Sequence, residues 1–114
     1  MLKSKYPYIK TNGEMVAVDW QGLTSGNLLA PIDRDENGQP APQSVGGPCG
    51  PNGVFTATVP SGEAFDPMTN CINWTDATGY GQWGDSSATG ASWTDDCGYE
   101  LNCSYQAPIY CVQQ

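Results

Sequence analysis

Histidine is absent from this chain of 114 residues. Histidine is the general base of Ser-His-Asp and Cys-His catalysis and a usual zinc ligand. Its absence excludes those mechanisms and the common zinc sites. The adjacent carboxylates of Asp95 and Asp96 do not form an acid/base couple either, because neighbouring side chains on a strand point to opposite sides. The sequence therefore predicts that the protein is not an enzyme.

Basic residues are also scarce: four Lys and Arg stand against twelve Asp and Glu, and the net charge is −8 at pH 7. Lys3, Lys5 and Lys10 lie in the first ten residues, so Arg34 is the only basic residue of the acidic remainder. Nucleic-acid binding requires a basic face that displaces counterions from phosphates. We therefore exclude nucleic acid as a partner.

Long apolar runs are missing as well. No run approaches the roughly 20 residues of a membrane-spanning helix, and no signal-peptide core follows Met1. We expect no membrane span, and we expect any export signal to have been removed or to lie outside this sequence. The 11% aromatic residues and five cysteines argue against disorder in spite of 14 Gly and 9 Pro. The length suits one small, disulfide-stapled domain over residues 1–114.

Local patterns predict a mostly β domain with long loops. Asn12-Gly13 separates two extended segments, so residues 6–18 are expected to form a hairpin. Two glycines within residues 20–29 favour a turn there over a helix, with Asp19 as a helix cap or turn residue. Further strands are expected at residues 54–59, 71–75 and 107–112, and residues 31–53 are expected to form a long loop.

The cysteines point to an oxidising compartment. No CxxC pair occurs, and without histidine a zinc site would need four thiolates at spacings that the chain lacks. Five cysteines allow two disulfides and one unpaired thiol. The odd one is a buried thiol, an intermolecular bridge, or the partner of a cysteine outside this sequence. We expect an extracellular or cell-surface location.

Many positions along the chain together resemble short bacterial secreted domains with a C-type-lectin-like, endostatin-like fold. The first half of the resemblance is carried by Tyr8-Ile9-x-Thr11-x-Gly13, Val16-Ala17-x-x-Trp20-x-x-Leu23-Thr24-x-Gly26-x-Leu28-x-Ala30-Pro31-Ile32 and Asp35-Glu36-x-Gly38. The second half is carried by Asn70-Cys71-x-Asn73-Trp74-Thr75, Gly81, Trp93-Thr94, Cys103 and Tyr110-Cys111. The resemblance implies an α+β fold with long loops and a binding role more often than catalysis.

The resemblance also implies a disulfide pattern. It pairs Cys71 with Cys103 and leaves Cys111 without a partner, because the family's last cysteine pairs with one on an N-terminal helix. Cys49 and Cys97 depart from the family pattern, and their simplest interpretation is an extra bridge. We expect that N-terminal helix to be missing from this sequence. We therefore expect either a fragment or a partner chain that supplies the missing layer.

One loop resembles the first half of an EF-hand calcium loop. Asp33, Asp35 and Asn37 provide oxygen ligands at alternate positions, and Gly38 permits the sharp turn. Ser44 stands where the bidentate Glu of an EF-hand would be, so a Ca²⁺ ion here would need a further carboxylate from elsewhere. The alternative interpretation is a solvated acidic turn.

A second set of candidate ligands lies in Trp93-Thr94-Asp95-Asp96, at the place where lectin-type domains carry a Trp-Asn-Asp triplet for Ca²⁺ and sugar. Thr94 replaces the Asn, and the Glu-Pro-Asn or Gln-Pro-Asp tripeptide that completes such a site does not occur. Asp95 and Asp96 remain candidate metal ligands. Trp83, Trp93 and Tyr99 are candidate ligand-binding aromatics, with core packing as the alternative for each.

Two functions follow from these observations. The first is an extracellular, non-catalytic module that recognises a glycan or a surface protein through its loops, with Ca²⁺ as a candidate cofactor. The second is a structural subunit of an extracellular appendage, filament or matrix. Its self-association would join the lysine-bearing N-terminus of one copy to the acidic body of the next.

Overall fold

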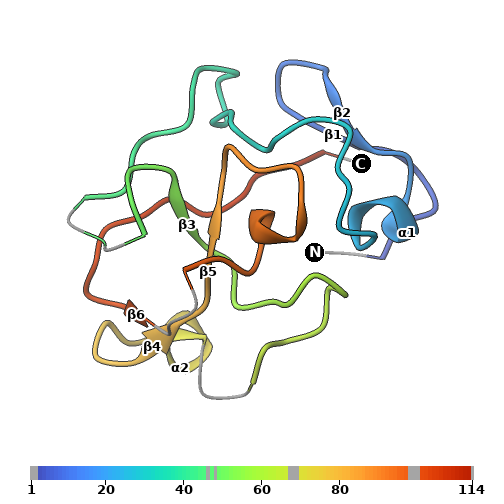
Figure 1. The fold of residues 1–114 in the computed structure, drawn as a ribbon. Coiled ribbons are helices and arrows are strands. Elements are labelled where there is room, and N and C mark those ends of the chain that lie inside the picture. Colours follow the sequence, from blue (N-terminus) through green and yellow to red (C-terminus); the bar gives the residue numbers. More distant parts are fainter. Residues whose placement is uncertain (1–2, 46, 48, 67–69, 98–100, 114) are drawn as a thin grey trace.

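The structure is a computed structural model that describes residues 3–45, 47, 49–66, 70–97 and 101–113. Short elements follow one another along the chain: β1 (Tyr8–Ile9), β2 (Met15–Ala17), α1 (Trp20–Leu23), β3 (Gly53–Phe55), α2 (Cys71–Trp74), β4 (Tyr80–Gly81), β5 (Trp83–Asp85), a 3₁₀ turn (Ala91–Trp93) and β6 (Leu101–Asn102). The strands form three antiparallel pairs, β1-β2, β3-β5 and β4-β6, linked by long loops (Figure 1). A small β-rich, disulfide-containing domain with long loops is therefore confirmed.

The expected N-terminal hairpin forms. Tyr8 lies opposite Ala17, and Gly13 takes the left-handed φ of +89° that the connecting turn requires. The turn closes when the backbone N–H of Gly13 donates to the carbonyl of Lys10 at 2.8 Å. Tyr8 and Val16 are fully buried, so the hairpin contributes directly to the core.

Residues 20–29 differ from the expected turn, because α1 makes one helical turn there. The carboxylate of Asp19 caps α1 by accepting the backbone N–H of Gly22 at 2.8 Å. At the other end, the hydroxyl of Thr24 donates to the carbonyl of Trp20. In the part of the chain that the structure describes, no helix has the length and apolar character needed to cross a membrane.

Three expected strands are corrected. The strand at residues 54–59 ends at Phe55, because Ala57 has a φ of 55° and turns the chain. Residues 71–75 contain no strand: all four residues of α2 have positive φ, so α2 is a left-handed turn. Residues 107–112 form no strand and have one isolated bridge, between Phe55 and Ile109.

The C-terminal segment joins two hydrophobic clusters. One cluster is built on the hairpin and α1: Tyr8, Val16, Ala17, Leu23, Leu28, Ile32 and Trp93. The other is built on the two remaining strand pairs: Phe55, Cys71, Trp83 and Leu101. Ala107 packs on the second cluster, and Tyr110 and Val112 pack on the first. In Figure 1 this segment runs from β6 across the molecule to the hairpin, where Gln113 bridges to Ile9.

Glycines let the aromatic rings pack directly on the backbone. A Cβ atom at Gly53 would lie 2.6 Å from the ring of Trp83, whose side chain is fully buried. At Gly84, a Cβ atom would overlap the carbonyl oxygen of Trp93 and lie 2.8 Å from the Cα atom of Thr94. Backbone atoms cannot rotate away as a side chain can, so position 84 accepts only glycine.

We expect Gly84→Ala to lower the free energy of unfolding by about 3 kcal/mol or more, because the added methyl group forces β5 away from residues 93–94. Urea denaturation measures this change. Gly90→Ala is the matched control: Gly90 has a φ of −79° and open space around its Cβ position, so we expect a change within about 0.5 kcal/mol. Equal midpoints for the two variants would contradict the packing described here.

Candidate functional site

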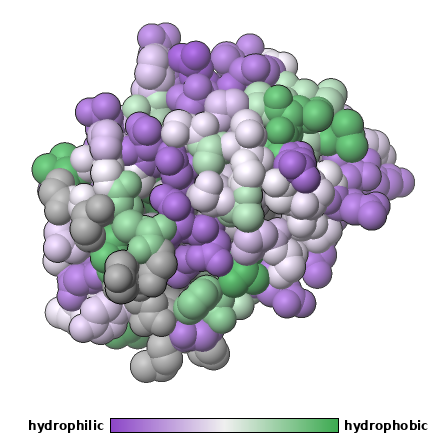
Figure 2. Space-filling model, viewed as in Figure 1, coloured by the Kyte–Doolittle hydropathy of each residue, from purple (hydrophilic) through white to green (hydrophobic). Residues whose placement is uncertain are grey.

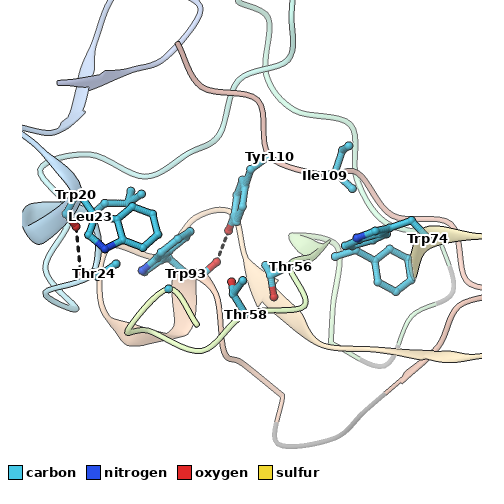
Figure 3. A pocket seen from close by; sticks show the side chains of 11 residues that line it. Trp20, Leu23, Thr24, Thr56, Thr58, Trp74, Trp93, Ile109 and Tyr110 are labelled. Atoms are coloured by element: carbon cyan, nitrogen blue, oxygen red, sulfur yellow. Dashed lines mark hydrogen bonds between the residues drawn. The ribbon is translucent and has the colours of Figure 1, made fainter. Parts of the chain in front are cut away.

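A cavity of about 390 Å³ lies between the two hydrophobic clusters. Its wall is mainly aromatic and aliphatic, with three threonines and one glycine: Trp20, Leu23, Thr24, Phe55, Thr56, Thr58, Gly62, Trp74, Trp93, Ile109 and Tyr110. Figure 3 shows Trp20 and Trp93 toward one end, Trp74 and Ile109 toward the other, and Tyr110, Thr56 and Thr58 between them. Trp74 and Ile109 are 53% and 63% exposed, so the cavity reaches the surface at that end. We call it the aromatic pocket.

Trp74 reaches the pocket from the left-handed turn α2. Left-handed conformations cost roughly 1–2 kcal/mol per non-glycine residue, so a run of four needs external support. Asn70 supplies part of it, because its side-chain oxygen accepts the backbone N–H of Asn73 at 2.8 Å. The disulfide from Cys71 to Cys103 anchors the start of the turn. The ring of Trp74 then meets Phe55 edge to face, with centroids 6.4 Å apart.

Tyr110 and Trp93 form the inner part of the pocket. Their ring centroids are 5.7 Å apart, and the phenol of Tyr110 donates a hydrogen bond to the backbone carbonyl of Trp93. Burial raises the pKa of the Tyr110 phenol far above its ordinary value of 10.0, and the nearby carboxylates of Asp85 and Asp96 raise it further. The phenol therefore stays neutral and serves as a structural donor.

The other hydroxyl groups of the wall also bind within the protein. Thr24 donates to the carbonyl of Trp20 at 2.9 Å, and Thr56 donates to the carbonyl of Thr94 at 2.6 Å. The hydroxyls of Thr58 and Thr94 bind each other at 2.6 Å. The indole N–H of Trp93 differs from these groups, because it is buried and has no hydrogen-bond partner among the described residues. The pocket therefore presents aromatic faces and very little free polarity.

The Asp33–Gly38 segment, expected as a calcium loop, is held by internal contacts. The ammonium group of Lys10 lies 2.9 Å from Asp33 and also pairs with Glu14, and the Lys10 side chain is only 2% exposed. Burial alone would lower the pKa of Lys10, but the two carboxylates outweigh it and hold that pKa above 10.5. One carboxylate oxygen of Asp35 accepts the backbone N–H groups of Asn37 and Gln39, both at 2.9 Å.

The second set of expected metal ligands lies beside the pocket wall. Asp95 accepts a hydrogen bond from the side chain of Gln82 at 2.5 Å, and the backbone N–H of Asp96 donates to the carbonyl of Trp83. Among the residues that the structure describes, no three Asp, Glu, Cys or His side chains gather as a metal site. The structure thus does not bring Asp33 and Asp35 together with Asp95 and Asp96.

The three aromatic residues expected to bind a ligand lie in different places. Trp93 lines the pocket, Trp83 is a fully buried core residue, and Tyr99 lies outside the described residues. Sequence reasoning missed three main wall residues: Trp20, Trp74 and Tyr110. Trp74 carried a readable signal, because it is an aromatic residue flanked by Asn73, Thr75 and Asp76, a setting that favours exposure.

Two disulfides staple the C-terminal half. Cys49 bonds to Cys97 and Cys71 to Cys103, which are the expected pairs, and Cys111 is free and exposed. Figure 2 shows that polar residues cover much of the visible face and that apolar residues gather in separate patches. No family model, curated protein or solved structure matches the chain.

The buried phenol predicts a loss of stability in alkali. In the unfolded chain Tyr110 ionises near pH 10.0, whereas in the folded chain it keeps its proton, so the unfolded state releases protons first. Above pH 10.0 we expect this residue to remove about 1.4 kcal/mol of stability per pH unit, and below that pH it has no effect on the slope. Urea denaturation on both sides of pH 10.0 measures the slope.

Tyr110→Phe should make the alkaline slope shallower by that amount. Tyr80→Phe is the matched control, because Tyr80 is 53% exposed and contributes no buried phenol. Lys10 adds to the loss in both variants and in the parent, since its raised pKa means that its stabilising charge disappears only at high pH. Identical slopes for Tyr110→Phe and the parent protein would show that the phenol is solvated.

Proposed function

We propose that the protein is an extracellular, non-catalytic binding module whose ligand inserts an apolar group into the aromatic pocket. The observation that carries the proposal is the pocket itself, a cavity of about 390 Å³ with three tryptophans, a tyrosine and a phenylalanine in its wall. A small protein rarely leaves such a cavity open to the surface without a ligand, since filling it with side chains would stabilise the fold. Exposed Trp74 and Ile109 form its rim.

The polarity of the wall favours a protein ligand over a glycan. A sugar carries hydroxyl groups on every side, and each buried hydroxyl needs a hydrogen-bond partner. The hydroxyl protons of Thr24, Thr56 and Tyr110 are donated to backbone carbonyls, so they are not available to a sugar. An apolar side chain of a partner protein needs no such partners and gains from aromatic contact.

Two further features support the extracellular part of the proposal and its fold class. The disulfides Cys49–Cys97 and Cys71–Cys103 suit an oxidising compartment. The C-type-lectin-like class stays part of the proposal. It is supported by the Cys71–Cys103 pair and by the long loops between short strands.

Trp74→Ala tests the pocket, with N-acetyltryptophanamide as a probe of an apolar protein side chain. We expect saturable binding to the parent protein and about tenfold weaker binding to the variant, because the rim loses its largest contact surface. Amide chemical-shift titration measures both affinities. EDTA and added Ca²⁺ should leave them unchanged, since no carboxylate of the described residues lines the pocket.

Ile72→Ala is the matched control for Trp74→Ala. Ile72 lies on the same left-handed turn and is 51% exposed, but it does not line the pocket. Equal losses in both variants would mean that the turn had relaxed rather than that a ligand contact was lost. If the parent protein does not bind the probe, or binds a methyl glycoside more tightly, the proposed protein ligand is wrong. If binding of the probe requires Ca²⁺, the Asp33–Gly38 loop would again be a candidate part of the binding site.

The exposed thiol of Cys111 could form an intermolecular disulfide, which favours the alternative function as a structural subunit. This alternative is tested separately. A binding module with two closed disulfides is expected to be a monomer with one titratable thiol per chain. Mass measurement under denaturing, non-reducing conditions gives both values, and Cys111→Ser should remove the thiol without changing probe binding. A covalent dimer that disappears in Cys111→Ser would instead support self-association.

A further inference from the structure

The aromatic pocket belongs to a chain with a net charge of −8 at pH 7, and two carboxylates act on its inner wall. Among the residues of its wall there is no charged side chain, but carboxylates follow the wall residues closely in the chain. Glu63 follows Gly62, Asp76 lies two positions after Trp74, and Asp95 and Asp96 lie two and three positions after Trp93. The pKa of the Tyr110 phenol is raised in part by Asp85 and Asp96, so these two charges act on the inner wall as well.

The aromatic faces of this region already attract a cation. The ammonium group of Lys3 lies 5.6 Å from the centroid of the Trp20 ring, within the range of a cation–π contact. Trp20 is also a wall residue of the pocket. Tryptophan offers the strongest cation–π attraction of the three aromatic side chains, and the pocket contains three of them.

We propose that the apolar group bound in the aromatic pocket carries a positive charge, as an alkylated ammonium group does. This inference rests on the proposed function, because it names the chemistry of the ligand for the same pocket. An alkylated ammonium group has an apolar surface and donates few or no hydrogen bonds, so it suits a wall whose hydroxyls are already paired. The acidic surroundings raise the local concentration of such a cation and repel anions.

Three small probes test the charge of the ligand. Choline carries a trimethylammonium group, its neutral isostere carries a tert-butyl group of the same shape, and phosphocholine adds an anion. We expect choline to bind about fivefold to thirtyfold more tightly than the neutral isostere. We expect phosphocholine to bind more weakly than choline, because its phosphate meets the carboxylates. Added salt should weaken choline binding and leave the isostere unaffected.

Amide chemical-shift titration of the parent protein, Trp74→Ala and Ile72→Ala gives the affinities. Choline binding that falls in Trp74→Ala but not in Ile72→Ala supports the inference. Isostere binding as tight as choline binding overturns the charge requirement and leaves the pocket intact as a site. If phosphocholine binds as tightly as choline, the carboxylates do not repel an anionic ligand, and the inference of an acidic environment is wrong. The ligand would then be a lipid headgroup instead of an alkylated protein side chain.

The failure of this inference is distinguishable from the failure of the proposed function. Binding of N-acetyltryptophanamide without binding of choline overturns only the charge requirement. If neither probe binds, both proposals fall together. Choline binding that survives Trp74→Ala unchanged would place the cation outside the pocket and overturn the inference even though binding occurs.

Discussion

Direct packing of aromatic rings on glycine backbone is the contact on which this small fold depends. Trp83 lies against Gly53, with no room for a Cβ atom, and Phe55 lies against Gly81 in the same way. Each ring therefore packs directly on the backbone of another strand, and each two- or three-residue strand gains more contact than its length alone would give. Gly53, Gly81 and Gly84 are thus part of the core rather than flexible filler. Substitutions there act as overpacking and not as changes in chain entropy.

The same constraint opens the pocket. A Cβ atom at Gly62 would overlap the ring of Trp20, so the absence of a side chain at this position lets the indole stand in the wall. On the far side, Trp74 depends on a left-handed turn that is held by Asn70 and by the disulfide of Cys71. Both ends of the pocket therefore rely on backbone conformations that a generic sequence would not adopt. Strain of this kind concentrates at functional sites, where the surrounding structure compensates for it.

Local chemistry made part of this architecture predictable. Asn12-Gly13 specifies its turn whatever surrounds it, and the hairpin formed where it was expected. Residues 71–75 look like a strand by composition, but the covalent link of Cys71 and the cap from Asn70 override that preference. The pocket could not be predicted as a unit, because its wall comes from segments as distant as Trp20 and Tyr110. Only the tertiary structure shows that such residues are neighbours.

Charge distribution connects the Asp33–Gly38 loop with the pocket. Lys10 is buried between Asp33 and Glu14, so an ammonium group of the protein already supplies positive charge to the loop that resembled a calcium site. Asp85 and Asp96, the carboxylates that act on Tyr110, form no salt bridge among the described residues, while Lys3 lies over the Trp20 ring of the pocket wall. These two carboxylates therefore add negative charge beside an apolar cavity. An apolar cation is the ligand class that satisfies both properties of that site, since burial of its surface and attraction of its charge act in the same place.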